Sequence, residues 1–258
     1  MKKILLALKN VSVGYGKKIV VNDISMSIKQ GKFIALVGLN GCGKTTLLRG
    51  ILGNATVSGD ILIQDKDLKK MSINEKAKEI AYISQHNNIT FSIDVWDVLL
   101  MGFNPYVSFW NKPNASMRKK AHDIMKAFNL EEYLHEDFLS LSGGQKQLVI
   151  FARAILQDSK IWLLDEPDSA MDFTNRHHVL NLVRETLKSS EKSALITIHD
   201  PNFALKYCDE IYFMSDGKLS DHVIVDEIAI DKLTAILNKV YGNIDVLEYE
   251  GRFVMVKK

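Results

Sequence analysis

The sequence predicts an α/β fold, in which helices flank a mostly parallel sheet, with an antiparallel β region near the N-terminus and an inserted helical segment. Short apolar runs bounded by turn residues recur along the chain, and helical patterns separate them after residue 156. Between residues 86 and 155 the apolar spacing changes to the period of amphipathic helices. With 258 residues, of which 47% are hydrophobic, the chain is long enough for one large domain with an insertion.

The elements can be placed in chain order. The expected strands are Ile4–Lys9, Val11–Tyr15, Ile19–Ile28, Lys32–Val37, Val57–Leu62, Ile80–Ser84, Ile161–Leu164, Ala194–Ile198 and Ile211–Ser215. A helix is expected over Thr45–Leu52 with Gly53 as its stop, and Ser72 with Glu75 has the capping-box spacing of a second helix. Val95, Leu99 and Leu100, and then Ala121, Ile124, Met125 and Phe128, recur at helical spacing.

These elements divide the chain into three parts. We expect residues 1–85 and 156–220 to form the core with its N-terminal β region, 86–155 a helical subdomain, and 221–258 a tail of helix and strand. The net charge of +2 gives no global field that favours nucleic acid or an anionic membrane surface. Only two cysteines occur, Cys42 and Cys208, so a disulfide framework is not expected. No apolar stretch approaches the roughly 18 residues that span a bilayer.

A phosphate-binding loop follows the predicted strand Lys32–Val37. Gly38, four further residues and then Gly43-Lys44-Thr45 make a complete P-loop motif between a strand and a helix, the context that the motif requires. Glycines let backbone N–H groups face phosphates, and the helix N-terminus and the lysine add positive potential. The residues assigned to nucleotide binding here are Gly38, Asn40, Gly41, Cys42, Gly43, Lys44, Thr45 and Thr46, with the Thr45 hydroxyl as a ligand for Mg²⁺.

Two carboxylates end the apolar strand at Ile161–Leu164. Asp165 and Glu166 therefore lie at the carboxyl edge of the sheet, where α/β proteins bind ligands. Their predicted roles differ: Asp165 holds a metal ion, directly or through water, and Glu166 orients or deprotonates an attacking water. A second small loop, Leu141–Gln145, lies between the P-loop and these acids and suggests a further phosphate-binding surface.

In the order and spacing of these motifs, the chain resembles the nucleotide-binding subunits of ABC transporters over nearly all of its length. Leu141–Gln145 matches the signature loop of that family, Ser169–Asp172 resembles its D-loop, and His199 matches its switch histidine. Gln85 matches the Q-loop, and Tyr15 the aromatic residue that stacks on adenine. The resemblance implies a P-loop NTPase with a RecA-like core, an ATPase in which Lys44, Gln85, Glu166 and His199 are catalytic and Thr45, Gln85 and Asp165 hold Mg²⁺.

The resemblance also implies partners. Two copies are expected to form a head-to-tail dimer around two ATP molecules, with Ser142, Gly143, Gly144 and Gln145 of one copy facing the nucleotide on the other. The segment from Phe91 to Tyr106 and the tail are most similar to the importer ATPases for iron-siderophore, haem and cobalamin. Such a subunit works at the cytoplasmic face of the cell membrane with polytopic permease subunits, and indirectly with a substrate-binding protein, and it binds no nucleic acid.

Some alternatives stay open from the sequence. A non-transport ABC ATPase, of the iron–sulfur assembly or DNA-maintenance type, is the second reading of the motifs. Cys42 is either a thiol whose pKa Lys44 depresses or an inert filler of the loop. Phe109 and Trp110 either line a groove that receives a permease helix or belong to a packed loop. The transported substrate cannot be read from this chain, because a permease and a binding protein would select it.

Overall fold

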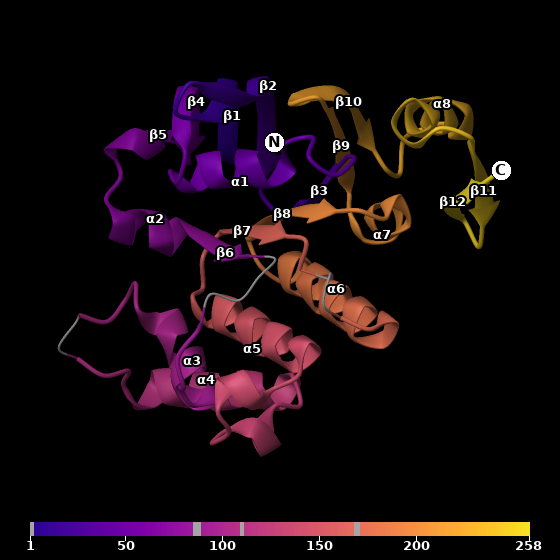
Figure 1. Cartoon of the computed structure of the whole chain (residues 1–258). Helices are drawn as coiled ribbons and strands as arrows, with labels where there is room; N and C mark the ends of the chain where they lie inside the picture. Colours follow the sequence, from indigo (N-terminus) through magenta and orange to yellow (C-terminus); the bar gives the residue numbers. More distant parts are fainter. Residues whose placement is uncertain (1–2, 85–88, 109–110, 168–170) are drawn as a thin grey trace.

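The computed structural model describes residues 3–84, 89–108, 111–167 and 171–258. Two sheets and the helices between them form the upper part of the molecule, and a separate helical part lies below (Figure 1). A small hairpin near the C-terminus lies beside the last helix at the far edge. The predicted α/β fold with an inserted helical subdomain is confirmed.

The central sheet has six strands in the order β10-β9-β3-β8-β7-β6, and all neighbours run parallel except β10 and β9. Every residue of β3, β7 and β8 is buried, so the sheet is covered on both faces. This explains why these strands are continuous apolar runs. The bounds are Phe33–Val37 for β3, Ile80–Ile83 for β6, Ile161–Asp165 for β7, Ser193–Ile198 for β8, Glu210–Ser215 for β9 and Lys218–Ile224 for β10.

Side chains of each central strand alternate between two apolar cores. In β3, Ile34 and Leu36 belong to the core shared with the antiparallel sheet and the helix α1 (Lys44–Leu52). Phe33, Ala35 and Val37 belong to the other core, which extends into the helical part. Because the side-chain period of a strand is two, one buried strand joins both layers and fixes the position of its own carboxyl end.

The antiparallel sheet has the order β2-β1-β4-β5. Its strands are β1 (Ile4–Tyr15), β2 (Lys18–Lys29), β4 (Thr56–Ile63) and the short β5 (Lys66–Asp67). We expected two strands, ending at Lys9 and beginning again at Val11, and this was wrong. Asn10 takes a left-handed φ of 49° and its N–H donates to Ser25 Oγ, so the pairing register shifts while the strand continues.

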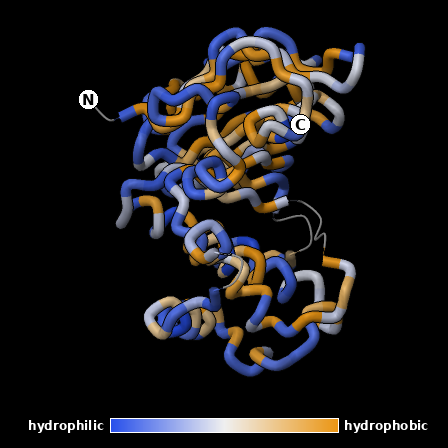
Figure 2. Tube along the Cα trace, turned by 90° about the vertical axis from the view of Figure 1, so that its left-hand side faces the viewer, coloured by the Kyte–Doolittle hydropathy of each residue, from blue (hydrophilic) through white to orange (hydrophobic). Residues whose placement is uncertain are grey.

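The helical part contains α3 (Val95–Leu100), α4 (Ala115–Ala127) and α5 (Gly143–Leu156), with short 3₁₀ turns at Met101–Phe103, Glu131–Tyr133 and Phe138–Ser140. Its apolar positions are interspersed along the chain with hydrophilic ones (Figure 2). Buried residues of α3, α4 and α5 pack into one core, which β6 and β7 share. The helical part therefore has no separate core, and α5 packs with the central sheet through this shared core.

The remaining helices flank the sheets or form the tail. They are α2 (Ile73–Glu79), which a turn at Leu68–Lys70 precedes, α6 (Phe173–Lys188), α7 (Pro201–Tyr207) and α8 (Ile230–Tyr241), and the tail ends in the hairpin of β11 (Ile244–Tyr249) and β12 (Arg252–Lys257). The Asn202 side chain holds this hairpin, since it accepts from Met255 N–H at 2.7 Å and donates to Met255 O at 3.1 Å. The pairing of β10 with β9 carries the central sheet beyond residue 220. No helix in the described ranges is both long and apolar enough to cross a bilayer.

Candidate nucleotide site

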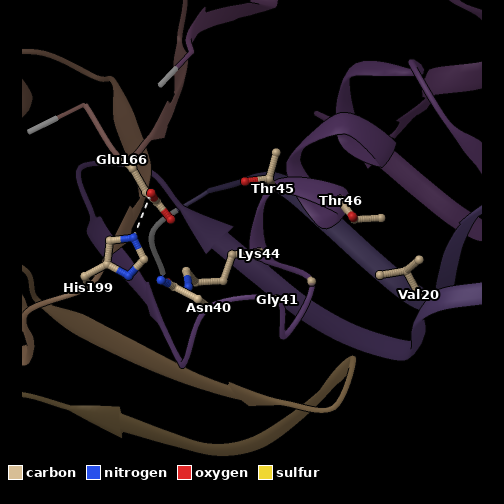
Figure 3. Close-up of a pocket in the computed structure, with 9 residues that line it drawn as sticks. Val20, Asn40, Gly41, Lys44, Thr45, Thr46, Glu166 and His199 are labelled. Carbon is tan, nitrogen blue, oxygen red and sulfur yellow. Dashed lines mark ion pairs between the residues drawn. The ribbon is translucent and has the colours of Figure 1, made fainter. Parts of the chain in front are cut away.

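Three neighbouring strands of the central sheet, β3, β8 and β7, end beside a cavity of about 330 Å³. Its lining residues come from the P-loop, the start of α1, the ends of β7 and β8, and β2: Val20, Asn40, Gly41, Gly43, Lys44, Thr45, Thr46, Glu166 and His199. Figure 3 shows Glu166 and His199 at one end of the cavity and Val20 and Thr46 at the other. Parts of the sequence more than 150 residues apart therefore meet at one sheet edge, where α/β folds bind ligands.

The P-loop presents the N-terminus of α1 to the cavity. Gly43 caps this helix with a left-handed φ of 110°, a conformation that a side chain would strain. Lys44 is 5% exposed, and its Nζ donates to Gly38 O at 2.8 Å and to Leu39 O at 3.3 Å. The ammonium group is thus folded over the loop, and a positive side chain lies next to the free N–H groups of a helix start. This arrangement suits a phosphate chain.

The turn between β9 and β10 supports the P-loop from behind. Gly217 N–H donates to Cys42 O at 3.0 Å, and Gly217 O accepts from Asn22 N–H of β2 at 2.7 Å. These backbone contacts tie the loop to both sheets. Sequence reasoning missed Gly217 and Asn22, because backbone hydrogen bonds between distant turns leave no residue pattern to read.

Asp165 is 1% exposed, and three hydroxyl groups hold its carboxylate. Thr45 and Thr197 donate to Oδ1 at 3.0 and 2.9 Å, and Tyr82 donates to Oδ2 at 3.1 Å. Burial, and then the neighbouring Asp165 carboxylate, raise the pKa of Tyr82 far above its usual value, so the phenol remains a donor. The sequence pointed to Asp165 and Thr45, and it gave no sign of Thr197 or Tyr82.

Glu166 and His199 form the acid–imidazole pair of the site. Glu166 Oε2 lies 2.7 Å from His199 Nε2, and the Glu166 side chain is largely buried while the imidazole is more open to solvent. Glu166 also has a left-handed φ of 46°, which is uncommon for a residue with a side chain. This backbone conformation, at the end of β7, places two adjacent acids in different surroundings: Asp165 among hydroxyls and Glu166 at the cavity wall.

The donor set fits Mg²⁺ bound together with a nucleotide. Within the described ranges, no group of three or more His, Cys, Asp or Glu side chains is placed to hold a metal ion. Thr45 and Asp165 together offer two oxygen ligands at the mouth of the P-loop. Mg²⁺ is commonly bound by one or two protein oxygens with phosphates and water completing its octahedron. The residues present therefore suit a metal ion that arrives with phosphate oxygens.

The predicted depression of the Cys42 pKa was wrong. The Cys42 side chain is buried in the loop, and this burial raises the pKa of the thiol, while the nearby Lys44 ammonium opposes the shift without reversing it. Desolvation of the buried thiol is the largest influence on its pKa and outweighs the attraction of the Lys44 ammonium for the thiolate. Cys42 therefore belongs to the packing of the loop.

Tyr15 ends β1 and is 43% exposed, but it is not one of the described residues that line the cavity. The Tyr15 phenol lies near the Arg49 guanidinium on α1 and raises the pKa of Arg49. Val20, which the sequence analysis did not single out, lines the cavity instead, as the third residue of β2 after the turn that follows Tyr15. The stacking of Tyr15 on adenine stays a prediction.

The residues Ser142 to Gln145 form the start of α5 and lie outside the cavity lining. Ser142 caps the helix: its Oγ accepts from Gln145 N–H at 3.3 Å, and Ser142 N–H donates to Gln145 Oε1 at 2.8 Å. Gly143 and Gly144 begin the helix after this cap. Met171 and Asp172 of the expected D-loop precede α6, which Asp172 caps. Gln85, Ser169, Ala170, Phe109 and Trp110 lie outside the described residues.

Comparison with known families gives a match to one described as ABC transporter over residues 21–169, more than half of the chain. A probable iron chelatin transport ATP-binding protein of Helicobacter pylori is 34% identical over 217 residues, covering 83% of this chain and 85% of its own. The hemin import ATP-binding protein HmuV of Vibrio parahaemolyticus is 33% identical over 248 residues, covering 94% and 92%.

The similar solved structures are also described as ABC transporters or their ATP-binding cassettes. An inward-facing conformation of a putative metal-chelate type ABC transporter matches with a TM-score of 0.81 and 26% identity, over 99% of this chain and 98% of that one. The ATP-binding cassette MJ0796, described as a dimeric post-hydrolysis state bound to ADP and Pi, matches with a TM-score of 0.75 and 25% identity, over 85% and 98%. The first of these likenesses extends over nearly the whole chain.

Proposed function

This chain belongs to the ABC transporter family of ATP-binding proteins, and from that premise we propose that it hydrolyses ATP to drive uptake of a metal chelate through a separate permease. One observation carries the enzymatic part: the P-loop with Lys44 and the Glu166–His199 pair line one cavity. The proposed transport of a metal chelate is supported by the names of the relatives and of the matching structure, which include iron chelatin, hemin and metal-chelate transporters.

In ATP hydrolysis at this site, the two ends of the cavity would have different roles. Lys44 and the N–H groups at the start of α1 bind the phosphates. A water beside the γ-phosphorus gives a proton to the Glu166 carboxylate as its oxygen bonds to phosphorus, and the bond to the bridging oxygen of ADP breaks. His199, 2.7 Å from Glu166, orients that carboxylate and is open enough to contact the γ-phosphate.

Magnesium fits this assignment through Thr45 and Asp165, with Gln85 as a further predicted ligand. When bound, the ion neutralises negative charge on the phosphate oxygens. The protein's own contribution is to keep the Asp165 carboxylate in one orientation among its hydroxyl donors.

We assign the α5 start to the nucleotide bound by a second copy. Its Ser142 and glycines form a capped helix N-terminus outside the cavity of their own chain, so they are available to a partner. The dimeric ADP- and Pi-bound state described for MJ0796 supports this arrangement. ATP then joins two copies in head-to-tail fashion, and its hydrolysis releases them.

The helical part is the proposed docking site for the permease. A cavity of about 660 Å³ lies there, between α3, the start of α4 and the loop that precedes α4; it is lined by Asp97, Leu100, Met101, Asn104, Val107, Ser108, Asn111, Lys112, Pro113 and Arg118. A helix of a polytopic permease is the occupant that we propose, which places this subunit peripherally at the cytoplasmic face of the cell membrane.

Co-expression with the candidate permease and binding protein tests the proposal. We expect the chain to co-purify with the permease and, in vesicles with enclosed ATP, to drive uptake of one of ferric siderophore, haem or cobalamin. Lys44→Ala is the matched control, since it should keep the complex and abolish uptake. ATPase activity that DNA stimulates, without association with a membrane protein, would contradict the transport role and favour a DNA-maintenance enzyme.

A further inference from the structure

Thr197 makes two hydrogen bonds that join the two acids of the site. It lies on β8 in register with Asp165 of β7, and it is fully buried. Its hydroxyl donates to Asp165 Oδ1 at 2.9 Å and accepts from Glu166 N–H at 2.9 Å. A hydroxyl has one proton and two lone pairs, so a single side chain serves the metal-binding acid and the backbone of the proposed base.

Tyr82 completes the support of Asp165 from the other neighbouring strand. It lies on β6, and its hydroxyl donates to Oδ2 at 3.1 Å, while Thr197 donates to Oδ1. The strands on both sides of β7 thus contribute one hydroxyl each, and each carboxylate oxygen has its own donor. With both oxygens held, the carboxylate plane cannot rotate without losing a hydrogen bond in a buried site.

We propose that Thr197 and Tyr82 are positioning residues for hydrolysis: together they fix the Asp165 carboxylate, and Thr197 alone also fixes the backbone of Glu166. The inference rests on the proposed ATPase function. Neither residue lines the cavity among the described residues, so neither is assigned a contact with the nucleotide.

Thr45 cannot replace them in this role. Its hydroxyl also donates to Asp165 Oδ1, at 3.0 Å, but the same oxygen is the P-loop ligand for Mg²⁺. A group assigned to the metal ion is not a dedicated support for the carboxylate. Neither Thr197 nor Tyr82 is assigned to the metal ion, so both are donors dedicated to the protein itself, one to each oxygen of Asp165.

The second contact of Thr197 concerns the strained backbone at Glu166. A non-glycine residue in the left-handed region is sparsely populated and persists only where its surroundings hold it. The bond from Glu166 N–H to Thr197 Oγ1 is such a restraint, in a place that water does not reach. Losing it should release the peptide that sets the direction of the Glu166 side chain toward His199.

Two nearly isosteric variants separate these effects. Thr197→Val should lower kcat for ATP about tenfold and leave KM within about twofold, since a lost buried hydrogen bond here acts on hydrolysis and the P-loop is untouched. Tyr82→Phe, which leaves Glu166 alone, should lower kcat less. Both should raise the Mg²⁺ concentration for half-maximal binding of a fluorescent ATP analogue about tenfold, with binding in EDTA unchanged.

Thr197→Ser and Ser193→Ala are the controls. Thr197→Ser keeps the hydroxyl and should restore both readouts. Ser193→Ala removes another fully buried hydroxyl of β8, which donates to Lys29 O, and should lower the melting temperature without changing the Mg²⁺ dependence. If Thr197→Val keeps the kcat and the Mg²⁺ dependence of the wild-type protein, the inference is wrong. If Thr197→Val does not fold, an unchanged Mg²⁺ dependence in Tyr82→Phe overturns the inference instead. A wild-type protein without Mg²⁺-dependent ATPase activity would instead overturn the proposed function, and this inference with it.

Discussion

Among single residues, Cys42 shows burial outweighing a neighbouring charge. Its thiol lies in an anion-binding loop two residues from Lys44, yet its pKa is raised. Because only the thiolate reacts, iodoacetamide should alkylate native Cys42 slowly at pH 7, and the rate should rise about tenfold per pH unit until the raised pKa is reached. Mass spectrometry of the tryptic peptide measures this rate.

The same peptide from protein unfolded in urea supplies the reference. There the thiol has its ordinary pKa, so alkylation at pH 7 should be faster than in the native protein and should level off at a lower pH. ATP should slow the native reaction further, since the loop lies under the phosphates. Rapid alkylation of native Cys42 at pH 7 would show that Lys44 controls the thiol after all.

At the scale of elements, the capped start of α5 can be compared with a matched helix in the same chain. Ser72 caps α2 with Glu75 as Ser142 caps α5 with Gln145, and both are complete capping boxes. Removing either hydroxyl, in Ser142→Ala or Ser72→Ala, should cost about 1 kcal/mol of the free energy of unfolding, measured in urea. Only Ser142→Ala should also abolish ATP-driven dimerisation and ATPase activity. Equal ATPase activity in the two variants would mean that Ser142 acts only as a helix cap.

Residue patterns predicted those parts of the fold and site that depend on local sequence. The runs Ile161–Leu164 and Ala194–Ile198 became β7 and β8 because strands buried on both faces are mostly apolar. The break at Asn10 was misread because a bulge and a turn use the same residue type. Thr197 and Tyr82 were missed because their role depends on which strands are neighbours in the sheet, and the sequence does not order them.

For the whole molecule, the proposed site is complete only in a dimer, and Glu166→Gln tests this. The amide keeps the size of the side chain but cannot take a proton from water, so kcat should fall about 10²–10⁴-fold. Nucleotide binding through Lys44 should persist, so ATP and Mg²⁺ should hold the variant as a stable dimer. Light scattering after gel filtration should then give twice the monomer mass with ATP and the monomer mass with ADP.

Two double variants test which contacts hold this dimer together. Adding Lys44→Ala to Glu166→Gln should return the protein to monomers because the phosphates lose their cation. Adding Ser142→Ala should also give monomers, although each chain still binds ATP in its own cavity. A Glu166→Gln protein that stays monomeric while binding ATP would argue against the head-to-tail dimer, and one with normal turnover against Glu166 as the base. The two halves of the proposal therefore fail separately: mass reports on the contact that a second chain supplies, and turnover lost while the dimer persists reports on the Glu166–His199 pair.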